Sequence, residues 1–367
     1  MILNRRLLLE LSGEHPKLPI AELQTVLNSI LSEPAKNDKI LKKLTDRLVI
    51  IDFENYSTDL IHQLSTRLSM CRTITELLDV YNAGSNEKLV KMLSSIKLPQ
   101  KATFKVSARH FNKNYKWSKN DSRNIKNKII KELLTFARAD VKHPDIEIIL
   151  FFGPEIYIAK KLIEINRRAF DSRRAHNRPF FAPISLHPRL ARCLINLAEL
   201  HESDVVLDPF CGTGGLLIEA GLMGFTIIGS DIDSRMVSGT KINLDHCGIK
   251  DYSLYNMDIA NLTELFSDTD SRHNQYSPPQ AIVTEPPYGR ASTTKGEALD
   301  SLLIRAFRIF NQILPPNGHV VISLPDPKLP SETFQKFKLK YKFTIRIHKS
   351  LTKTIFVLIN NKNQKRS

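Results

Sequence analysis

The chain has few cysteines and no long apolar run. Its 367 residues include four cysteines, Cys71, Cys193, Cys211 and Cys247, and no Cys-x-x-Cys pair. This spacing predicts neither a metal site nor a disulfide framework, and single thiols of this kind are typical of a reducing, cytoplasmic location. No stretch of about 18 apolar residues occurs, so we expect no membrane-spanning helix.

Other features that would place the chain in a special class are also missing. The N-terminal residues 1–6 lack the layout of a signal peptide. No internal repeat or low-complexity tract is evident. Hydrophobic residues make up 42% and charged residues 25% of the chain, as in ordinary globular proteins. The length predicts two or three domains, each with its own core.

Acidic residues are under-represented relative to basic ones. The net charge is +15, and residues 101–142 alone hold 12 Lys and Arg against three Asp and Glu. Such a concentration of positive charge indicates a polyanionic partner for the N-terminal half of the chain. A solvated, lysine-rich surface with no partner is the simpler alternative, and it stays open here.

The N-terminal half alternates between strand and helix patterns, which predicts α+β structure. We divide it into a first domain, residues 1–72, and a second domain, residues 73–164. Strands are predicted at 5–13, 47–53, 103–109, 146–152 and 156–160, and helices at 19–31, 57–69 and 122–139. Residues 165–185 are rich in arginine and proline and are predicted to form a linker.

Residues 186–360 alternate regularly between strand and helix, which is typical of a doubly wound α/β sheet. Strands are predicted at 205–208, 226–230, 281–284 and 319–324 and around 343–347 and 355–359, and helices at 188–200, 215–223, 234–247 and 299–314. In such sheets ligands bind at the carboxyl ends of the strands. The segments that follow each strand are therefore the candidate site.

A glycine-rich loop follows the first strand of this region. It reads Asp208-Pro209-Phe210-Cys211-Gly212-Thr213-Gly214-Gly215. Glycines here allow positive φ and remove side chains from the path of a nucleoside cofactor. The loop is not a dinucleotide fingerprint, because Leu217 stands where the third glycine would be, and no Gly-Lys-Ser/Thr follows as in a phosphate-binding loop.

Two aspartates end the next two strands. Asp231 is suited to accept hydrogen bonds from both ribose hydroxyls of a nucleoside. Asp258 follows a short apolar stretch and is suited to the adenine amino group. Each aspartate could instead be a helix N-cap, but their order after the glycine loop favours the cofactor interpretation.

The turn Glu285-Pro286-Pro287-Tyr288 carries the most specific signal. An aromatic amine is a poor nucleophile, and a carboxylate and a backbone carbonyl that accept its N–H bonds would orient it for attack. Two prolines would hold these acceptors rigidly, and Tyr288 would stack on a base that has left its helix. With no cysteine beside the turn, methylation through a covalent cysteine adduct is not expected. The pattern predicts methyl transfer from S-adenosylmethionine to an exocyclic nitrogen of a base.

These segments resemble one known family. Residues 8–16, 178–194 and 346–358, together with the glycine loop and the Pro-Pro-Tyr-Gly-Arg turn, are similar to those of archaeal tRNA guanine dimethyltransferases that act on the 2-amino group of guanosine 10. The resemblance covers nearly the whole chain. It implies an α/β protein with ferredoxin-like and THUMP domains followed by a doubly wound, Rossmann-like methyltransferase domain.

The resemblance also implies the partners and the site residues. The partners are tRNA and S-adenosylmethionine, with 2-methyl- and 2,2-dimethylguanosine as products. We expect a monomer without a membrane or an obligatory protein partner. The catalytic candidates are Glu285, Pro286, Pro287 and Tyr288. The cofactor candidates are Asp208, Pro209, Gly212, Thr213, Gly214, Asp231, Ile232, Asp258 and Ile259. The candidate RNA contacts are Lys105, Arg109, Lys113, Lys116, Arg173, Arg174 and Arg178.

Two alternatives remain at this point. One is a 2-amino methyltransferase that acts on another tRNA guanosine, such as position 6. The other is a THUMP-bearing tRNA-binding protein with weakened catalysis, because the family's turn usually begins with Asp or Asn and this one begins with Glu285. Methylation of DNA adenine uses a similar turn but leaves residues 1–184 without a role.

Overall fold

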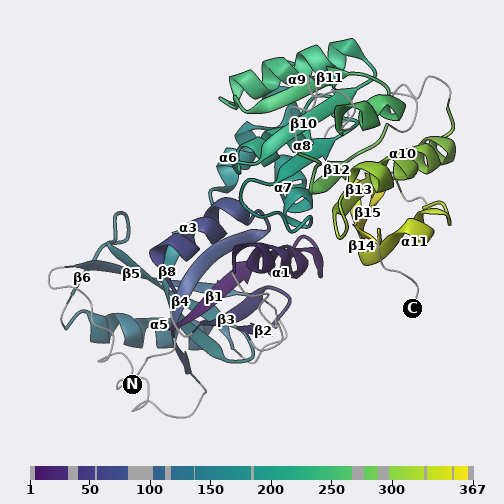
Figure 1. Cartoon of the computed structure of the whole chain (residues 1–367). Coiled ribbons are helices and arrows are strands. Elements are labelled where there is room, and N and C mark those ends of the chain that lie inside the picture. The colour runs from purple at the N-terminus through teal and green to yellow at the C-terminus, as the bar shows by residue number, and fades with distance from the viewer. Residues whose placement is uncertain are drawn as a thin grey trace. The chain divides into compact units, whose positions relative to one another are not determined.

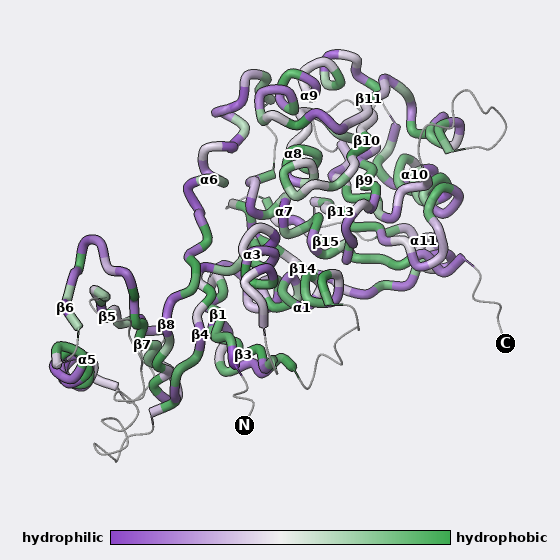
Figure 2. Tube along the Cα trace, turned by 60° about the vertical axis from the view of Figure 1, so that its left-hand side comes forward, coloured by the Kyte–Doolittle hydropathy of each residue, from purple (hydrophilic) through white to green (hydrophobic). Residues whose placement is uncertain are grey.

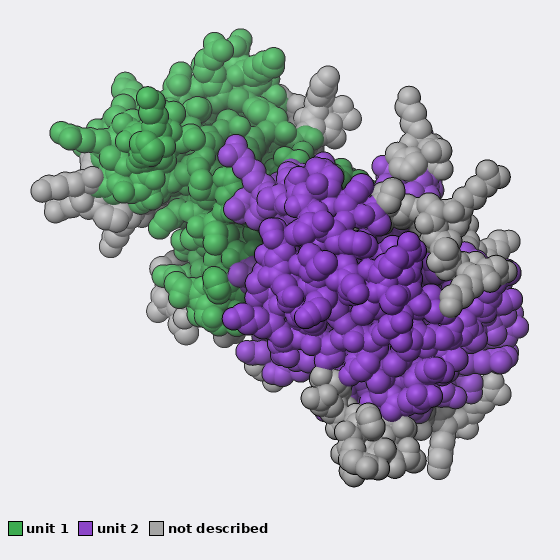
Figure 3. Space-filling view, turned by 90° about the horizontal axis from the view of Figure 1, so that it is seen from above, with its two compact units in different colours: residues 1–19, 35–65, 70–165 green, residues 20–34, 66–69, 166–367 purple. Residues whose placement is uncertain are grey.

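A computed structural model describes residues 5–31, 40–53, 56–81, 102–111, 117–135, 137–182, 186–266, 277–287, 297–325, 329–348 and 351–362. The chain divides into two compact units (Figure 3). Unit 1 contains residues 1–19, 35–65 and 70–165, and unit 2 contains residues 20–34, 66–69 and 166–367. Across these described stretches, no helix is both long and apolar enough to cross a membrane.

Unit 1 is built on one sheet, which has eight strands within the described residues, in the order β2-β3-β1-β4-β8-β7-β5-β6. The strands are β1 Arg5–Leu11, β2 Leu41–Lys43, β3 Leu48–Phe53, β4 Cys71–Tyr81, β5 Thr103–His110, β6 Arg138–Ala139, β7 Ile146–Phe152 and β8 Ile156–Glu164. The sequence does not predict β4, which pairs with both β1 and β8. This strand joins the two ranges expected as separate domains into one sheet.

Two helices accompany this sheet, α3 Thr58–Arg67 and α5 Lys119–Leu133. Helix α5 starts with a capping box in which Ser118 and Asp121 bond each other's backbone N–H. Its apolar face packs on the β-strands through Ile129 and Leu133. The sequence predicts that this helix continues to residue 139, but residues 138–139 instead pair with β5 as β6.

Unit 2 contains the doubly wound sheet that the sequence predicts (Figure 1). Its order among the described strands is β11-β10-β9-β12-β13-β15-β14. The strands are β9 Val205–Asp208, β10 Thr226–Asp231, β11 Tyr252–Asn256, β12 Ala281–Thr284, β13 His319–Leu324, β14 Phe337–His348 and β15 Leu351–Asn360. Strands β9 to β13 run parallel, and β14 and β15 form an antiparallel edge. The direction of winding reverses between β9 and β12, which lie side by side.

Short helices cover this sheet. They are α1 Leu18–Ile30, α6 Arg167–Ser172, η1 Ala175–Asn177, α7 Pro188–Asn196, α8 Gly215–Gly221, α9 Ser234–His246, η2 Ile259–Phe266, α10 Leu299–Ile313 and α11 Thr333–Lys336. Helix α10 shows both hydrophobic and hydrophilic colours along its length (Figure 2). Its apolar face places Phe307 and Phe310 in a core with Val320 and Phe356 of the sheet.

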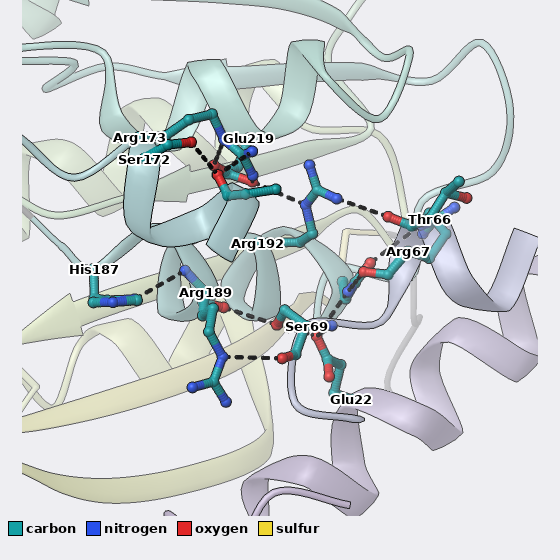
Figure 4. A network of polar contacts seen from close by, with 12 residues as sticks. Glu22, Thr66, Arg67, Ser69, Ser172, Arg173, His187, Arg189, Arg192 and Glu219 are labelled. Carbon is teal, nitrogen blue, oxygen red and sulfur yellow. Dashed lines mark hydrogen bonds and ion pairs between the residues drawn. The ribbon is translucent and has the colours of Figure 1, made fainter. Parts of the chain in front are cut away.

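Segments from the N-terminal half complete unit 2. The Glu22 side chain of α1 is fully buried. Its Oε1 accepts hydrogen bonds from Ser69 N (3.0 Å), Ser69 Oγ (2.6 Å) and Asn196 Nδ2 (2.9 Å). Ser69 Oγ also lies 2.8 Å from Arg189 O, and Arg189 Nε donates to Ser69 O at 3.2 Å (Figure 4). A buried carboxylate with several donors thereby ties residues 20–30 and 66–69 to α7.

A second buried carboxylate joins α6, α7 and α8. Glu219 of α8 is fully buried and lies between Arg173 and Arg192 (Figure 4). Arg173 donates to both carboxylate oxygens, at 2.8 Å and 3.0 Å. Arg192 forms an ion pair with Glu219 at 2.9 Å and donates to Thr66 O at 2.7 Å. The segment expected to be a linker is therefore part of the folded unit.

We expect the Glu22→Ala substitution to destabilise the protein. Removing the carboxylate leaves buried donors of Ser69 and Asn196 without their acceptor, which should lower the free energy of unfolding by roughly 3 kcal/mol. Urea unfolding monitored by circular dichroism measures this change. The control is Asp59→Ala, which removes an exposed carboxylate that accepts from Gln63 and should cost less than about 1 kcal/mol. Equal losses in the two variants would contradict this role of Glu22.

Candidate active site

The glycine loop lies where β9 turns into α8. Gly212 and Gly214 have φ of +52° and +79°, a left-handed backbone that favours glycine. A Cβ on Gly214 would also lie 2.9 Å from Thr240 Cγ2 of α9. Thr240 Oγ1 donates to Gly212 O at 2.7 Å. Helix α9 therefore packs directly on the loop and fixes its backbone.

Asn243 of α9 links the loop to the segment before α7. Its Nδ2 donates to Thr213 O at 3.0 Å and to Phe180 O at 2.9 Å. Phe180 N donates back to Asn243 Oδ1 at 3.0 Å. The Phe180 ring packs against Gly239, where a Cβ would come within 2.1 Å of it. Helix α9 thus holds the glycine loop, and the segment around Phe180 in turn packs on α9.

Asp208 is the last residue of β9 and is almost fully buried. Its Oδ1 accepts from Thr284 Oγ1 at 2.6 Å and from Phe210 N at 3.2 Å. Burial raises the pKa of Asp208 to about 7, and the nearby charges of Asp231 and Glu285 also raise it. The hydrogen bond to Thr284 connects the ends of β9 and β12, the two strands at the point of reversal.

Asp231 ends β10, as the sequence predicts. Its Oδ2 accepts from Gly212 N at 3.0 Å and its Oδ1 from Asp233 N at 2.9 Å. Burial raises its pKa. Ile232 follows and is half-buried. The position suits the predicted ribose contact, and the bond to Gly212 holds the carboxylate against the glycine loop.

Asp258 lies at the start of η2. Its Oδ1 accepts from Ala260 N at 2.8 Å, which is the capping bond expected of an aspartate before a helix. Asp258 also forms an ion pair with Arg305 of α10, which pairs in turn with Glu297 at 2.7 Å. The next residue, Ile259, is buried. The adenine contact of Asp258 stays a prediction.

The Glu-Pro-Pro segment follows β12 directly. Pro286 is buried, and Glu285 and Pro287 are half-buried. The Glu285 carboxylate contacts the Lys353 ammonium through an ion pair with Oε1. Tyr288 lies outside the described residues. The edge of the sheet at β9, β10 and β12 therefore carries the carboxylates of Asp208, Asp231 and Glu285 beside the glycine loop.

Most of the candidate RNA contacts already have protein partners. Arg109 contacts Glu10 and donates to Thr73 Oγ1 at 2.7 Å. Arg173 is held by Glu219, and the Arg178 side chain is buried, with Nε donating to Arg173 O at 2.9 Å. Their phosphate contacts stay predictions.

The remaining candidates differ in exposure. Arg174 pairs with Asp171 at 2.8 Å and keeps 47% of its side chain exposed. Lys105 keeps 34% of its side chain exposed and lies 3.9 Å from Glu147. Lys113 and Lys116 lie outside the described residues.

Sequence reasoning missed the partners of the site residues. Thr284, Lys353 and Arg305 contact Asp208, Glu285 and Asp258 from residues 76, 68 and 47 positions away in the chain. Only the strand–helix order, which places the ends of β9 and β12 together, was available as a signal for Thr284. For Lys353, the available signal was its place in a strand of mostly apolar residues and threonine, where a lysine is unusual.

The arrangement fits a cationic nucleoside. The glycines keep side chains away from the loop backbone, and carboxylates at the carboxyl ends of parallel strands attract positive charge and hydroxyl donors. Burial raises the pKa of the Cys211 thiol, so this residue is unsuited to nucleophilic catalysis. The geometry therefore favours direct transfer of a group between two bound molecules over catalysis through a covalent cysteine adduct.

We expect stability to fall with rising pH because of Asp208. Its folded pKa of about 7 lies above the value near 4 of an unfolded aspartate, so the folded state binds more protons between these values. The stabilisation that Asp208 contributes is fully present below about pH 4 and is lost as pH rises through about 7. The free energy of unfolding should therefore fall by roughly 2–3 kcal/mol between pH 5 and pH 8.

Urea unfolding at both pH values measures this change. The Asp208→Asn variant should lack this component of the pH dependence, whereas Asp59→Asn, on the exposed face of α3, should keep it. If the free energy of unfolding of Asp208→Asn changed with pH as much as that of the wild type, Asp208 would contribute nothing to the pH dependence.

Comparison with known proteins places these features in a family. Residues 175–355 match the RMKL-like methyltransferase domain, and residues 86–158 match the THUMP domain. TrmN from Thermus thermophilus superposes with a TM-score of 0.57 at 18% identity, over 97% of this chain and 99% of that chain. A possible methylase from Clostridium difficile 630 gives a TM-score of 0.54 at 18% identity, over 99% of this chain and all of that chain. These likenesses confirm the predicted fold class.

Sequence relatives are more specific. The chain is 32% identical over 368 residues to the tRNA (guanine(10)-N2)-dimethyltransferase of Methanothermobacter thermautotrophicus, covering 95% of this chain and 97% of the relative. The enzyme of the same name from Methanocaldococcus jannaschii is 28% identical with the same coverage. Human tRNA (guanine(10)-N(2))-methyltransferase TRMT11 is 26% identical over 88% of this chain and 73% of the relative. The chain belongs to the family of the tRNA (guanine(10)-N2)-dimethyltransferases.

Proposed function

We propose that this protein methylates the exocyclic 2-amino group of guanosine 10 in tRNA, giving 2-methyl- and then 2,2-dimethylguanosine. The observation that carries the proposal is the Glu285-Pro286-Pro287 segment at the end of β12, directly beside the glycine loop of β9 and within the sequence of a family named for this reaction. The methyl donor is S-adenosylmethionine. This activity is favoured over both alternatives because the relatives that match nearly the whole chain carry that name.

The residues present fit S-adenosylmethionine. When bound, it supplies an electrophilic methyl group on a sulfonium ion. We propose that the cofactor lies against the backbone of Pro209, Gly212, Thr213 and Gly214. Asp231 would accept hydrogen bonds from its ribose hydroxyls. Because burial raises the pKa of both Asp208 and Asp231, a cationic ligand would favour their ionised forms.

Asp258, Ile232 and Ile259 complete the proposed cofactor set. They follow β10 and β11 and would surround the adenine ring, with Asp258 accepting from its amino group. Arg305, which forms an ion pair with Asp258, would hold that carboxylate in place. These assignments rest on the order of the strands and on the apolar character of the two isoleucines.

In the proposed mechanism Glu285 and the Pro286 carbonyl accept hydrogen bonds from the 2-amino group of guanine. Two successive prolines restrict φ, so these acceptors keep their positions as the amine approaches. The Glu285 carboxylate then takes the proton that the amine releases. Tyr288 would stack on the base, which must leave its helical stack to reach the site.

We assign tRNA binding to the N-terminal half, with residues 1–72 as the ferredoxin-like part and residues 73–164 as the THUMP part. Support comes from the THUMP match at residues 86–158 and from the outer face of α5. That face exposes Lys119, Arg123, Lys128 and Lys131. With Lys105 and Arg174, these side chains are better placed for phosphates than the arginines that Glu10 and Glu219 already hold.

The enzyme is proposed to act as a monomer in the cytoplasm. All four cysteines are free thiols, and three of them are buried, which fits a reducing compartment. Sedimentation of the purified chain with and without tRNA would test the monomer, and a mass that corresponds to two chains would contradict it.

Methyl transfer to unmodified tRNA tests the function directly. We expect labelled S-adenosylmethionine to give 2-methyl- and 2,2-dimethylguanosine at position 10, identified by nucleoside analysis and mapping. The matched control is the same tRNA with inosine at position 10, which lacks only the 2-amino group and should accept no methyl. Methylation of the inosine tRNA, or of a different nucleotide, would contradict the proposal.

The glycine loop makes a prediction about cofactor binding. Gly214→Ala should weaken binding of S-adenosylhomocysteine at least about tenfold, or roughly 1.4 kcal/mol, because the added Cβ would displace Thr240 and the loop. Gly224→Ala is a matched control, since Gly224 also has positive φ (+86°) but nothing lies within 4 Å of an added Cβ.

Both variants should lose about 1–2 kcal/mol of stability from backbone strain. Titration calorimetry measures the binding, and equal weakening in both would show that strain alone is responsible.

A further inference from the structure

Lys353 is an unusual residue for the position that it occupies. It lies in β15 and is 3% exposed. In the sheet, β13 separates β15 from β12, yet the Lys353 side chain reaches Glu285 at the end of β12 and forms an ion pair with Oε1. Its neighbours in β15 from Ile355 to Leu358 are apolar and buried. A lysine is rarely found so deeply buried unless it is paired.

Stability alone is a weak reason for such a pair. The desolvation of two buried charges cancels much of their attraction, and well-packed apolar residues of similar volume are often as stable. The location is informative, because Lys353 contacts the carboxylate that follows β12 and not one of the structural carboxylates Glu22 or Glu219.

A glutamate at this place in the turn needs such a contact. Its side chain has one more rotatable bond than aspartate, so without an anchor the carboxylate would sample several positions. A carboxylate can accept about four hydrogen bonds, so an ion pair at Oε1 is compatible with accepting from a substrate amine as well. The charge of Glu285 raises the pKa of Asp208, so these two carboxylates repel each other, and a neighbouring cation offsets that repulsion.

We propose that Lys353 is a positioning residue for methyl transfer: its ammonium anchors the Glu285 carboxylate in the orientation that accepts the target amine. The proposal rests on the proposed function of Glu285. It makes the lysine and the glutamate a matched pair, in which the length of Glu285 is suited to the reach of Lys353.

The first experiment compares steady-state methylation of unmodified tRNA by the wild type, Lys353→Met and Lys353→Arg. Met keeps the unbranched chain up to Cε and removes the ammonium group, whereas Arg keeps the charge. We expect Lys353→Met to lower kcat about tenfold to a hundredfold, as for a catalytic group misplaced by about 1 Å, with KM for both substrates changed less than about twofold. Lys353→Arg should recover part of the loss.

The matched control is Lys340→Met. Lys340 of β14 forms an ion pair with Glu199 in the same unit, away from the site. Its loss should change thermal stability but leave kcat within about twofold. An unchanged kcat in Lys353→Met, or a loss of affinity for the cofactor with kcat intact, would overturn the proposal.

A double-mutant cycle with Glu285→Gln separates positioning from general destabilisation. If Lys353 acts through Glu285, adding Lys353→Met to Glu285→Gln should lower kcat no further. A further loss as large as in the wild-type background would overturn the proposal.

Glu285→Asp keeps Lys353 intact and covers the case in which Lys353→Met does not fold. The shorter carboxylate should lower kcat about tenfold or more because it moves away from the ammonium, and a higher kcat would overturn the matched pair. A wild type that fails to methylate tRNA would instead refute the proposed function, so the two failures are distinguishable.

Discussion

The hydrogen bond between Asp208 and Thr284 is the interaction on which the site depends. It joins the ends of β9 and β12, the two neighbouring strands between which the winding of the sheet reverses. A parallel sheet necessarily opens at such a point, because the connections leave in opposite directions. By fixing the two strand ends together, this bond sets the glycine loop against the Glu-Pro-Pro segment. The two segments proposed to hold the cofactor and the target base are thereby kept side by side.

Buried carboxylates recur as the means by which helices are fixed around this centre. Glu219 holds α6 and α7 against α8, which itself begins at the glycine loop. Glu22 holds α1 and residues 66–69 against α7. In both places the carboxylate is fully buried and surrounded by donors, so each network is specific in geometry as well as in charge. The catalytic unit is therefore assembled from three separate stretches of the chain.

The sequence predicted what is encoded locally. The strands before the glycine loop and the Pro-Pro turn are apolar runs bounded by turn residues, and both are found where expected. It missed β4, because Arg72, Glu76 and Asp79 interrupt the apolar pattern of a strand whose neighbours come from both sides of the expected boundary. It also could not show that Arg173 is held by Glu219 or that the Arg178 side chain is buried, since sequence reveals a charge but not its partner. Lys353 could not be assigned for the same reason: its role follows from a contact with a residue 68 positions away.

The interleaving of the chain has a consequence for how the protein folds during synthesis. Glu22 and Asn196 are 174 residues apart, and α1 leaves the ribosome long before α7 exists. Until then the apolar face of α1 has no partner within its own unit, and such delayed, long-range contacts slow folding and expose surfaces that aggregate. A fragment that starts at residue 166 would lack α1 altogether. Division of this protein for expression or for fusion should follow its interwoven units and not the linear order of its domains.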